Sequence, residues 1–166
     1  MINDKEFENA LSRQIATYGK ETMGILIKLE VFLIGLRGLG VEVAKNLILA
    51  GPKRVVLFDD NITTIQDLGS NFYLKESDVG KNRRDKACLE KLKELNPRCE
   101  VEVSDFNPLS DPSRLSKFNV VCITEMQNSE YISKVNLALR ENKGALIYGV
   151  ATGLSGTIFT DFGPSH

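Results

Sequence analysis

Short apolar runs alternate with helically spaced apolar residues along this chain of 166 residues. Residues 31–34 and 54–58 are short and β-rich, and each is followed by glycine or by side chains that favour turns, which is typical of buried parallel strands. Between them, apolar residues recur on one helical face until Gly51 and Pro52 end the pattern. Two strands flanking one helix predict a right-handed βαβ unit.

The same alternation continues through the rest of the chain. The pattern predicts an N-terminal helix from Asn3 with Phe7, Leu11, Ile15 and Tyr18 on one face, a helix at 82–95, strands at 99–103 and 120–123, a helix bearing Tyr131, Val135, Leu137 and Leu139, and strands at 145–150 and 156–161. Residues 62–80 form a long, mostly polar connection with short helical pieces, and such connections are usually functional. The predicted fold class is therefore α/β, a doubly wound Rossmann-type sheet, mostly parallel, with flanking helices in one domain over residues 1–166.

Composition excludes several classes of function. Lys and Arg total 21 against 22 acidic residues, so no field of one sign favours nucleic acid or a membrane surface. No apolar stretch approaches the roughly 20 residues that a bilayer span needs. Three widely spaced cysteines and one histidine, His166, do not predict a zinc site. These features favour an intracellular protein with reduced thiols.

A glycine turn after the first strand is the main candidate for chemistry. The segment GLRGLG at residues 35–40 lies between a strand and a helix, the context in which GxGxxG binds a nucleotide pyrophosphate. Gly35 and Gly40 are in register, but Arg37 replaces the middle glycine, whose missing side chain lets phosphates approach the backbone. Arg37 could bind phosphate or fill a site that no longer takes a nucleotide. We favour the second interpretation, because one guanidinium does not replace several lost amide contacts.

An acidic pair follows the second strand. Asp59 and Asp60 stand about 20 to 25 residues beyond the turn, where a carboxylate would hold a ribose. The alternative is that this pair simply ends the strand and caps the next segment of the chain. Because Arg37 interrupts the glycine turn, we favour the alternative.

Four segments together resemble the N-terminal half of the ubiquitin-activating enzyme family. They are LSRQIATYG at 11–19, FLIGLRGLGVEVAKNLILAG at 32–51, DLGSNFYLKESDVGKNR at 67–83 and GLSGTIFTDFG at 153–163. The resemblance spans nearly the whole chain in order. It implies an adenylation unit of two related Rossmann domains of the ThiF/MoeB type, of which one half binds ATP and magnesium.

The resemblance further implies that this chain is the inactive half. Where the active half has an ATP-binding aspartate, this chain has Asn61, and at Ser70 the arginine of the next segment is missing. Lys81 matches a phosphate-binding lysine, and Glu125 falls near a magnesium ligand in a loop whose alignment stays open. No cofactor and no metal are expected in this half. The degenerate site is expected around Gly35, Arg37, Gly40, Asn61 and Lys81.

The resemblance also implies a catalytic role for Arg13. It matches an arginine that this family extends across the interface between the halves, toward ATP in the partner site. Such an arginine finger places a delocalised cation near the charge that develops on the phosphates. The alternative for Arg13 is an exposed helix residue or an ion pair.

In the reaction that the family performs, the ubiquitin C-terminus attacks the α-phosphate of ATP, and a cysteine then takes the acyl group as a thioester. The implied partners are the active half of the same enzyme, ubiquitin and, through other domains, ubiquitin-conjugating enzymes, in the cytoplasm and nucleus. Cys88 and Cys122 fall in a predicted helix and strand, where thiols usually serve as apolar fillers. The chain is therefore expected to be a fragment of a larger enzyme, inactive alone, with an unpaired face that could self-associate.

Two other functions remain open. One is a catalytic homodimer resembling the sulfur-carrier adenylating proteins, with two equal sites. The other is an NAD-dependent oxidoreductase with an unusual glycine turn. Arg37 and the absence of a histidine from the body of the chain count against the oxidoreductase.

Overall fold

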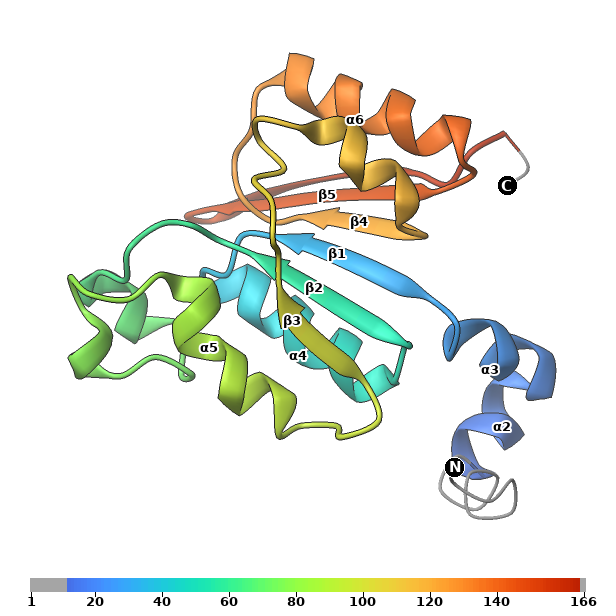
Figure 1. Cartoon of the computed structure of the whole chain (residues 1–166), viewed down its shortest axis with the longest axis horizontal. Coiled ribbons are helices and arrows are strands. Elements are labelled where there is room, and N and C mark those ends of the chain that lie inside the picture. Colours follow the sequence, from blue (N-terminus) through green and yellow to red (C-terminus); the bar gives the residue numbers. More distant parts are fainter. Residues whose placement is uncertain (1–11, 165–166) are drawn as a thin grey trace.

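A computed structural model of the chain describes residues 12–164. Figure 1 shows one sheet with helices on both of its faces, and two short N-terminal helices beside it. In chain order the elements are α2 (Ser12–Tyr18), α3 (Lys20–Leu26), β1 (Glu30–Ile34), α4 (Gly38–Ala50), β2 (Arg54–Phe58), η1 (Ile65–Gly69), η2 (Glu76–Asp78), α5 (Arg84–Lys93), β3 (Glu100–Val103), η3 (Pro112–Lys117), β4 (Val120–Ile123), α6 (Ser129–Glu141), β5 (Ala145–Thr152) and β6 (Ser155–Asp161).

The strands form one six-stranded sheet in the order β3-β2-β1-β4-β5-β6. Val31 of the central strand β1 pairs with Val55 of β2 on one side and with Val120 of β4 on the other, both in parallel. Within this sheet, as described over residues 12–164, the pairing of β5 with β6 is antiparallel and the others are parallel. The strand order reverses between β1 and β4, as in doubly wound sheets. The predicted fold class is thus confirmed.

Two hydrophobic cores lie on opposite faces of this sheet. Because successive strand side chains point to opposite faces, Leu33 packs on the side of α4 and α5, whereas Phe32 and Ile34 pack on the side of η3 and α6. All three side chains are fully buried. Helices on both faces explain why the β1 run is continuously apolar rather than alternating.

Two apolar residues of the predicted helices are exposed. Over its described residues the N-terminal helix is confirmed as α2, which ends before Gly19 at φ 84°, but Tyr18 is 64% exposed rather than packed on the body of the domain. The predicted residues from Asn3 to Leu11 lie outside the described part. In α6, Tyr131 and Val135 are buried, but Leu137 is 64% exposed, since it lies two residues from Val135 and therefore on another side of the helix.

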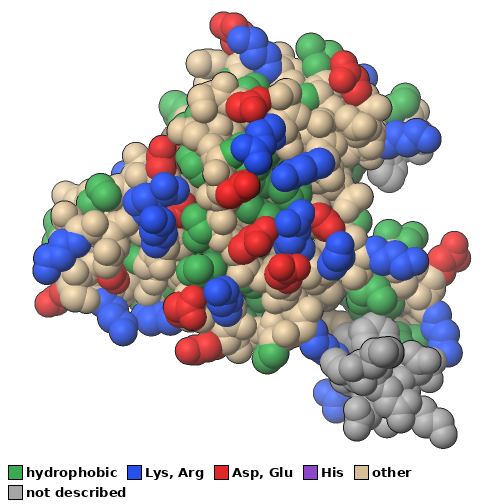
Figure 2. Space-filling model, viewed as in Figure 1, with side chains coloured by type: hydrophobic (Ala, Val, Ile, Leu, Met, Phe, Trp, Pro, Cys, Tyr) green, Lys and Arg blue, Asp and Glu red, His purple; other side chains and the backbone are tan. Residues whose placement is uncertain are grey.

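The surface and the helices agree with the composition. On the face seen in Figure 2, acidic and basic side chains intermingle, without a large area of one sign. Among residues 12–164, none of the helices combines the length and the apolar character needed to cross a bilayer.

Candidate functional site

The glycine turn joins β1 to α4 at the carboxyl edge of the sheet. Gly35 adopts φ 92°, a conformation that favours glycine, and its N–H donates to the Phe58 carbonyl at 2.9 Å. A Cβ at Gly40 would lie 2.0 Å from the Gly35 oxygen, so only glycine lets α4 start this close to β1. Both glycines therefore have packing roles that do not require a nucleotide.

Both backbone polar groups of Leu36, within the turn, are bound by side chains of the protein itself. The Leu36 N–H donates to Asp59 Oδ2 at 2.8 Å, and the Leu36 carbonyl accepts from Asn71 Nδ2 at 2.8 Å. All three residues are buried. A turn that binds phosphate offers free amides to its ligand, and the Leu36 amide is already used.

The side-chain oxygens of Asp59 are also bound by groups of the protein itself. Its side chain is fully buried at the end of β2, where Arg84 Nη1 lies 3.2 and 3.3 Å from its two oxygens. Asp59 Oδ1 also accepts from the backbone N–H and the side-chain amide of Asn61. With these partners and the Leu36 amide, Asp59 is turned inward and does not present a free carboxylate to a ribose. The neighbouring Asp60 is exposed.

Arg37 is the residue immediately before α4. Its side chain is 65% exposed, and its Nε lies 3.8 Å from Asp67 Oδ1. That this side chain takes the room of bound phosphates stays a prediction. The buried contacts of Leu36 and Asp59 are a second feature of the turn that bears on nucleotide binding.

Asp67 belongs to the connection between β2 and α5. Its Oδ2 accepts from the N–H and the hydroxyl of Thr64, at 2.8 and 2.9 Å, and from Arg84 Nε at 2.9 Å. Burial acts to raise the pKa of Asp67, but the hydrogen bonds from Thr64 and Arg84 outweigh it, so the pKa is lowered. Asp67 is therefore an ionised carboxylate that begins η1 and holds Arg84.

Glu125 follows β4 and lies against the turn. A Cβ at Gly35 would meet Glu125 Cβ and Cγ at 3.2 Å, and Thr124 Oγ1 at 2.9 Å. Burial raises the pKa of Glu125, and the negative charge of Asp59 adds to the shift. The raised pKa means that this site favours the neutral form of Glu125 more than water does.

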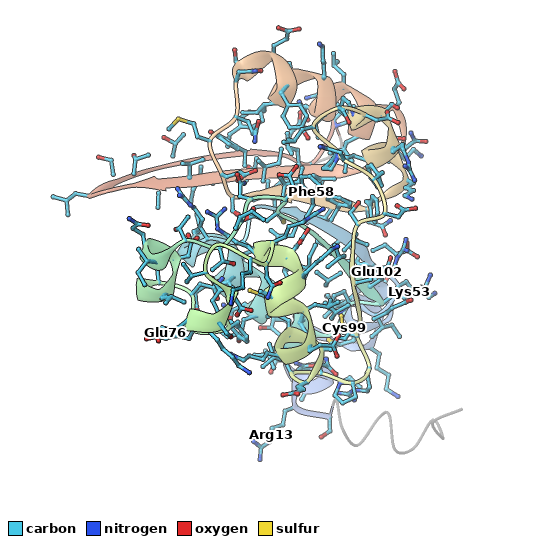
Figure 3. All side chains as sticks on the ribbon, turned by 60° about the vertical axis from the view of Figure 1, so that its left-hand side comes forward. Arg13, Lys53, Phe58, Glu76, Cys99 and Glu102 are labelled. Carbon is cyan, nitrogen blue, oxygen red and sulfur yellow. The ribbon has the colours of Figure 1, made fainter. Side chains whose placement is uncertain are left out.

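Of the remaining predicted residues, Asn61 and Lys81 lie near the carboxyl edge of the sheet, and Arg13 lies far from it. Asn61 and Lys81 are exposed, and their segments run side by side, because Thr63 N–H donates to the Asn82 carbonyl and Arg84 N–H to that of Asn61. The structure thus brings the turn, Asn61 and the segment of Lys81 together. Arg13 is exposed on α2 and lies apart from Phe58, the last residue of β2 (Figure 3).

Sequence reasoning missed two residues that hold the turn and its surroundings. Asn71 donates to the Leu36 carbonyl, and Arg84 of α5 contacts Asp59, which in turn accepts the Leu36 N–H. No local pattern in the sequence indicates such contacts. A basic residue in the first turn of a helix is ordinarily exposed, whereas the Arg84 side chain is 4% exposed. The carboxylates of Asp59 and Asp67, brought together only by the fold, account for its burial.

The thiols and the acidic groups offer no other centre. Burial raises the pKa of Cys88 to about 11 and of Cys122 to about 12, so both stay protonated and unreactive at neutral pH, as predicted for apolar fillers. Within residues 12–164, His, Cys, Asp and Glu side chains form no group of three or more that could hold a metal ion. His166 lies outside that range.

Known proteins resemble this chain over nearly its whole length. The model of the ThiF family matches residues 11–164. Ubiquitin-activating enzyme E1 1 of Triticum aestivum is 44% identical over 158 residues, and ubiquitin-activating enzyme E1 2 of Arabidopsis thaliana is 41% identical over 165 residues. These matches cover 95% and 98% of this chain but 15% of each relative, so the chain spans about a seventh of their length.

Solved structures share this fold. The crystal structure of E. coli tRNA N6-threonylcarbamoyladenosine dehydratase superposes with a TM-score of 0.74, covering 93% of this chain and 66% of that one. The sequence identity is 18%, so this similarity establishes the fold alone.

Proposed function

The chain belongs to the ThiF family, and we propose that it is the nucleotide-silent half of the adenylation unit of a ubiquitin-activating enzyme. The whole enzyme would use ATP to adenylate the ubiquitin C-terminus and pass it to a cysteine as a thioester. ATP and magnesium would be held by the other half. Ubiquitin and ubiquitin-conjugating enzymes would be partners of the whole enzyme, in the cytoplasm and nucleus.

The observation that carries the silent role is the engagement of Asp59. In a nucleotide-binding doubly wound domain, the acidic residue after β2 binds the ribose. Here Asp59 accepts from Leu36 and Arg84 and is fully buried. Binding a ribose would require breaking a buried, charge-assisted contact, which is costly because a buried charge would lose its partner.

An apolar groove supports pairing with the active half. It has a volume of about 300 Å³ and is lined by Leu39 and Val43 of α4, Ile147 of β5 and Ile158 of β6, among others. Ile158 is 79% exposed. Exposed apolar surface of this kind marks protein interaction sites. Most of the length of the relatives lies outside the matched region, and the occupant that we propose is the second ThiF-type half.

In this proposal Arg13 acts in trans. It lies on α2, beside the amino ends of the strands, whereas the glycine turn lies at their carboxyl ends (Figure 1). Arg13 therefore does not serve the turn of its own copy. A guanidinium exposed on a peripheral helix is accessible to a site on a partner domain.

Titration of the chain with ATP and magnesium, followed by calorimetry, tests the silent role. We expect no saturable binding at sub-millimolar nucleotide, and the same result for the Arg37→Gly variant, in which the middle glycine of the motif is restored. The reason is that Asp59 and Leu36 remain engaged in both proteins.

Two results would contradict this proposal, and a third would contradict only the reason given for it. Tight ATP binding by the chain would favour the homodimeric adenylating protein with two equal sites. Tight NAD binding in a parallel titration would favour the oxidoreductase. ATP binding by Arg37→Gly alone would mean that the arginine, and not the engagement of Asp59, silences the site.

A further inference from the structure

Arg84 is a buried arginine at the first residue of α5, and it contacts two carboxylates from different parts of the chain. Its Nε lies 2.9 Å from Asp67 Oδ2, and its Nη1 lies 3.2 Å from Asp59 Oδ1. The side chains of Arg84, Asp59 and Asp67 are 4%, 0% and 5% exposed. We call these three residues the Arg84 cluster.

The Arg84 cluster links the glycine turn to the connection between β2 and α5. On one side, Asp59 accepts the N–H of Leu36 in the turn. On the other side, Asp67 caps η1 through Thr64 and accepts Arg84. Asn71, whose N–H donates to the Asp67 carbonyl, completes the link by donating to the Leu36 carbonyl. Residues 64–71 are thus fixed to the turn by contacts that all arise within the chain.

The energetics of buried charge indicate what this cluster contributes. Replacing a buried ion pair by apolar groups is often neutral, whereas removing one partner is strongly destabilising. Net stability is therefore a weak reason for an arginine here. Fixing one arrangement is the stronger reason, because Arg84 satisfies both carboxylates only when the connection lies against the strand end.

We propose that Arg84 is a positioning residue that takes the place of a bound nucleotide, holding the connection 62–80 in one arrangement over the glycine turn without any ligand. In nucleotide-binding proteins, loops around the phosphates are often ordered by the ligand itself. Here a guanidinium from α5 provides the cation and the donors. The inference deepens the proposed function and rests on it, because a residue can replace a nucleotide only in a half that binds none.

Hydrogen exchange of the 166-residue chain, read peptide by peptide, tests the inference. The variants are Arg84→Met, Arg84→Lys, and the triple variant Asp59→Asn/Arg84→Met/Asp67→Asn, which removes all three charges together. Arg98→Met is the matched control, since it also removes one guanidinium but Arg98 is exposed and lies between α5 and β3. Peptides from β4 and α6 report the state of the remaining fold.

In the triple variant we expect peptides from 62–80 to exchange at least about tenfold faster, while β4 and α6 keep their protection, because no unpaired charge is left buried. Arg84→Met leaves two carboxylates unpaired and should accelerate hydrogen exchange about a hundredfold. The peptides from 62–80 should lose their protection before those from β4 and α6. Arg84→Lys should fall between Arg84→Met and the unmodified chain. Arg98→Met should leave the exchange of 62–80 unchanged.

The inference is overturned if the triple variant is folded and its 62–80 peptides exchange as slowly as in the unmodified chain. If Arg84→Met does not fold, the triple variant still tests the inference, because it leaves no unpaired charge buried. Adding ATP and magnesium separates this inference from the proposed function. If ATP slows the hydrogen exchange of the unmodified chain, the chain binds nucleotide and the proposed function is wrong. The comparison of the variants without ATP still tests whether Arg84 holds the connection.

Discussion

Gly40 has no room for a side chain. A Cβ there would lie 2.0 Å from the Gly35 oxygen and 2.5 Å from Thr124 Oγ1, and the Thr124 hydroxyl is fixed because it contacts the Ile34 and Gly35 carbonyls. The Gly40→Ala substitution must therefore move backbone. We expect a loss of about 2 kcal/mol or more in the free energy of unfolding, measured by urea denaturation.

Gly24→Ala is the matched control. Gly24 lies in α3, and a Cβ there would meet no atom within 4 Å. Alanine should therefore stabilise the helix by about 0.5–1 kcal/mol. A Gly40→Ala variant as stable as the unmodified chain would contradict the close approach of α4 to β1.

Individual residues were predictable where the signal is local. The left-handed conformation of Gly35 and the close packing at Gly40 agree with a glycine turn recognised by spacing alone. The sequence favoured a structural role for Asp59 but did not identify its partners, because Leu36 and Arg84 are 23 and 25 residues away in the chain. Contacts of that range depend on the packing of α5 and have no pattern in the sequence.

Among the elements, the final strand β6 is joined to α6 through Asp161. Its Oδ2 accepts from Asn136 Nδ2 at 2.8 Å and from Arg140 Nε at 2.7 Å, and its Oδ1 accepts from the Gly163 N–H at 2.8 Å. These contacts, with the Asn136 hydrogen bond the largest influence, lower the pKa of Asp161 to about 2. The folded state therefore favours the ionised carboxylate more than the unfolded chain does.

The direction of the pH dependence follows from the lowered pKa of Asp161. Its contribution to stability is fully present above the unfolded value of about 3.9 and is lost as the pH falls toward about 2. We expect Asp161→Asn to lower the melting temperature at neutral pH and to have little effect near pH ~2. An equal change in melting temperature at both pH values would mean that the charge of Asp161 does not stabilise the contact between β6 and α6.

At this scale the sequence predicted most of the fold. Short continuous apolar runs located β1, β2 and β4, which are buried on both faces, and helical periodicity located α4 and α6, which bury one face. The break at Gly19 was not predicted, because Ile15 and Tyr18 keep a helical spacing up to it. The spacing of apolar residues does not reveal a left-handed glycine within an otherwise helical segment.

At the scale of the whole molecule, Arg13 and the glycine turn lie at opposite ends of the strands (Figure 1). The turn, Asn61 and the segment of Lys81 share the carboxyl edge of the sheet, while α2 lies beside its amino ends (Figure 1). The sequence predicted Arg13 through a resemblance and not through its surroundings. Its proposed role depends on a second domain, so neither periodicity nor the packing of one chain could establish it.

Arg13→Ala in the longer enzyme tests this role directly. Loss of a guanidinium supplied in trans should slow adenylate formation by about a thousandfold, the lower end of arginine-finger effects, because charge on the phosphates would lose its partner. ATP-dependent pyrophosphate exchange measures that step. Arg98→Ala is the control, as Arg98 is also exposed but lies between α5 and β3. Exchange that stays unchanged in Arg13→Ala would exclude a catalytic arginine on α2, and would leave this half with a purely structural role in pairing.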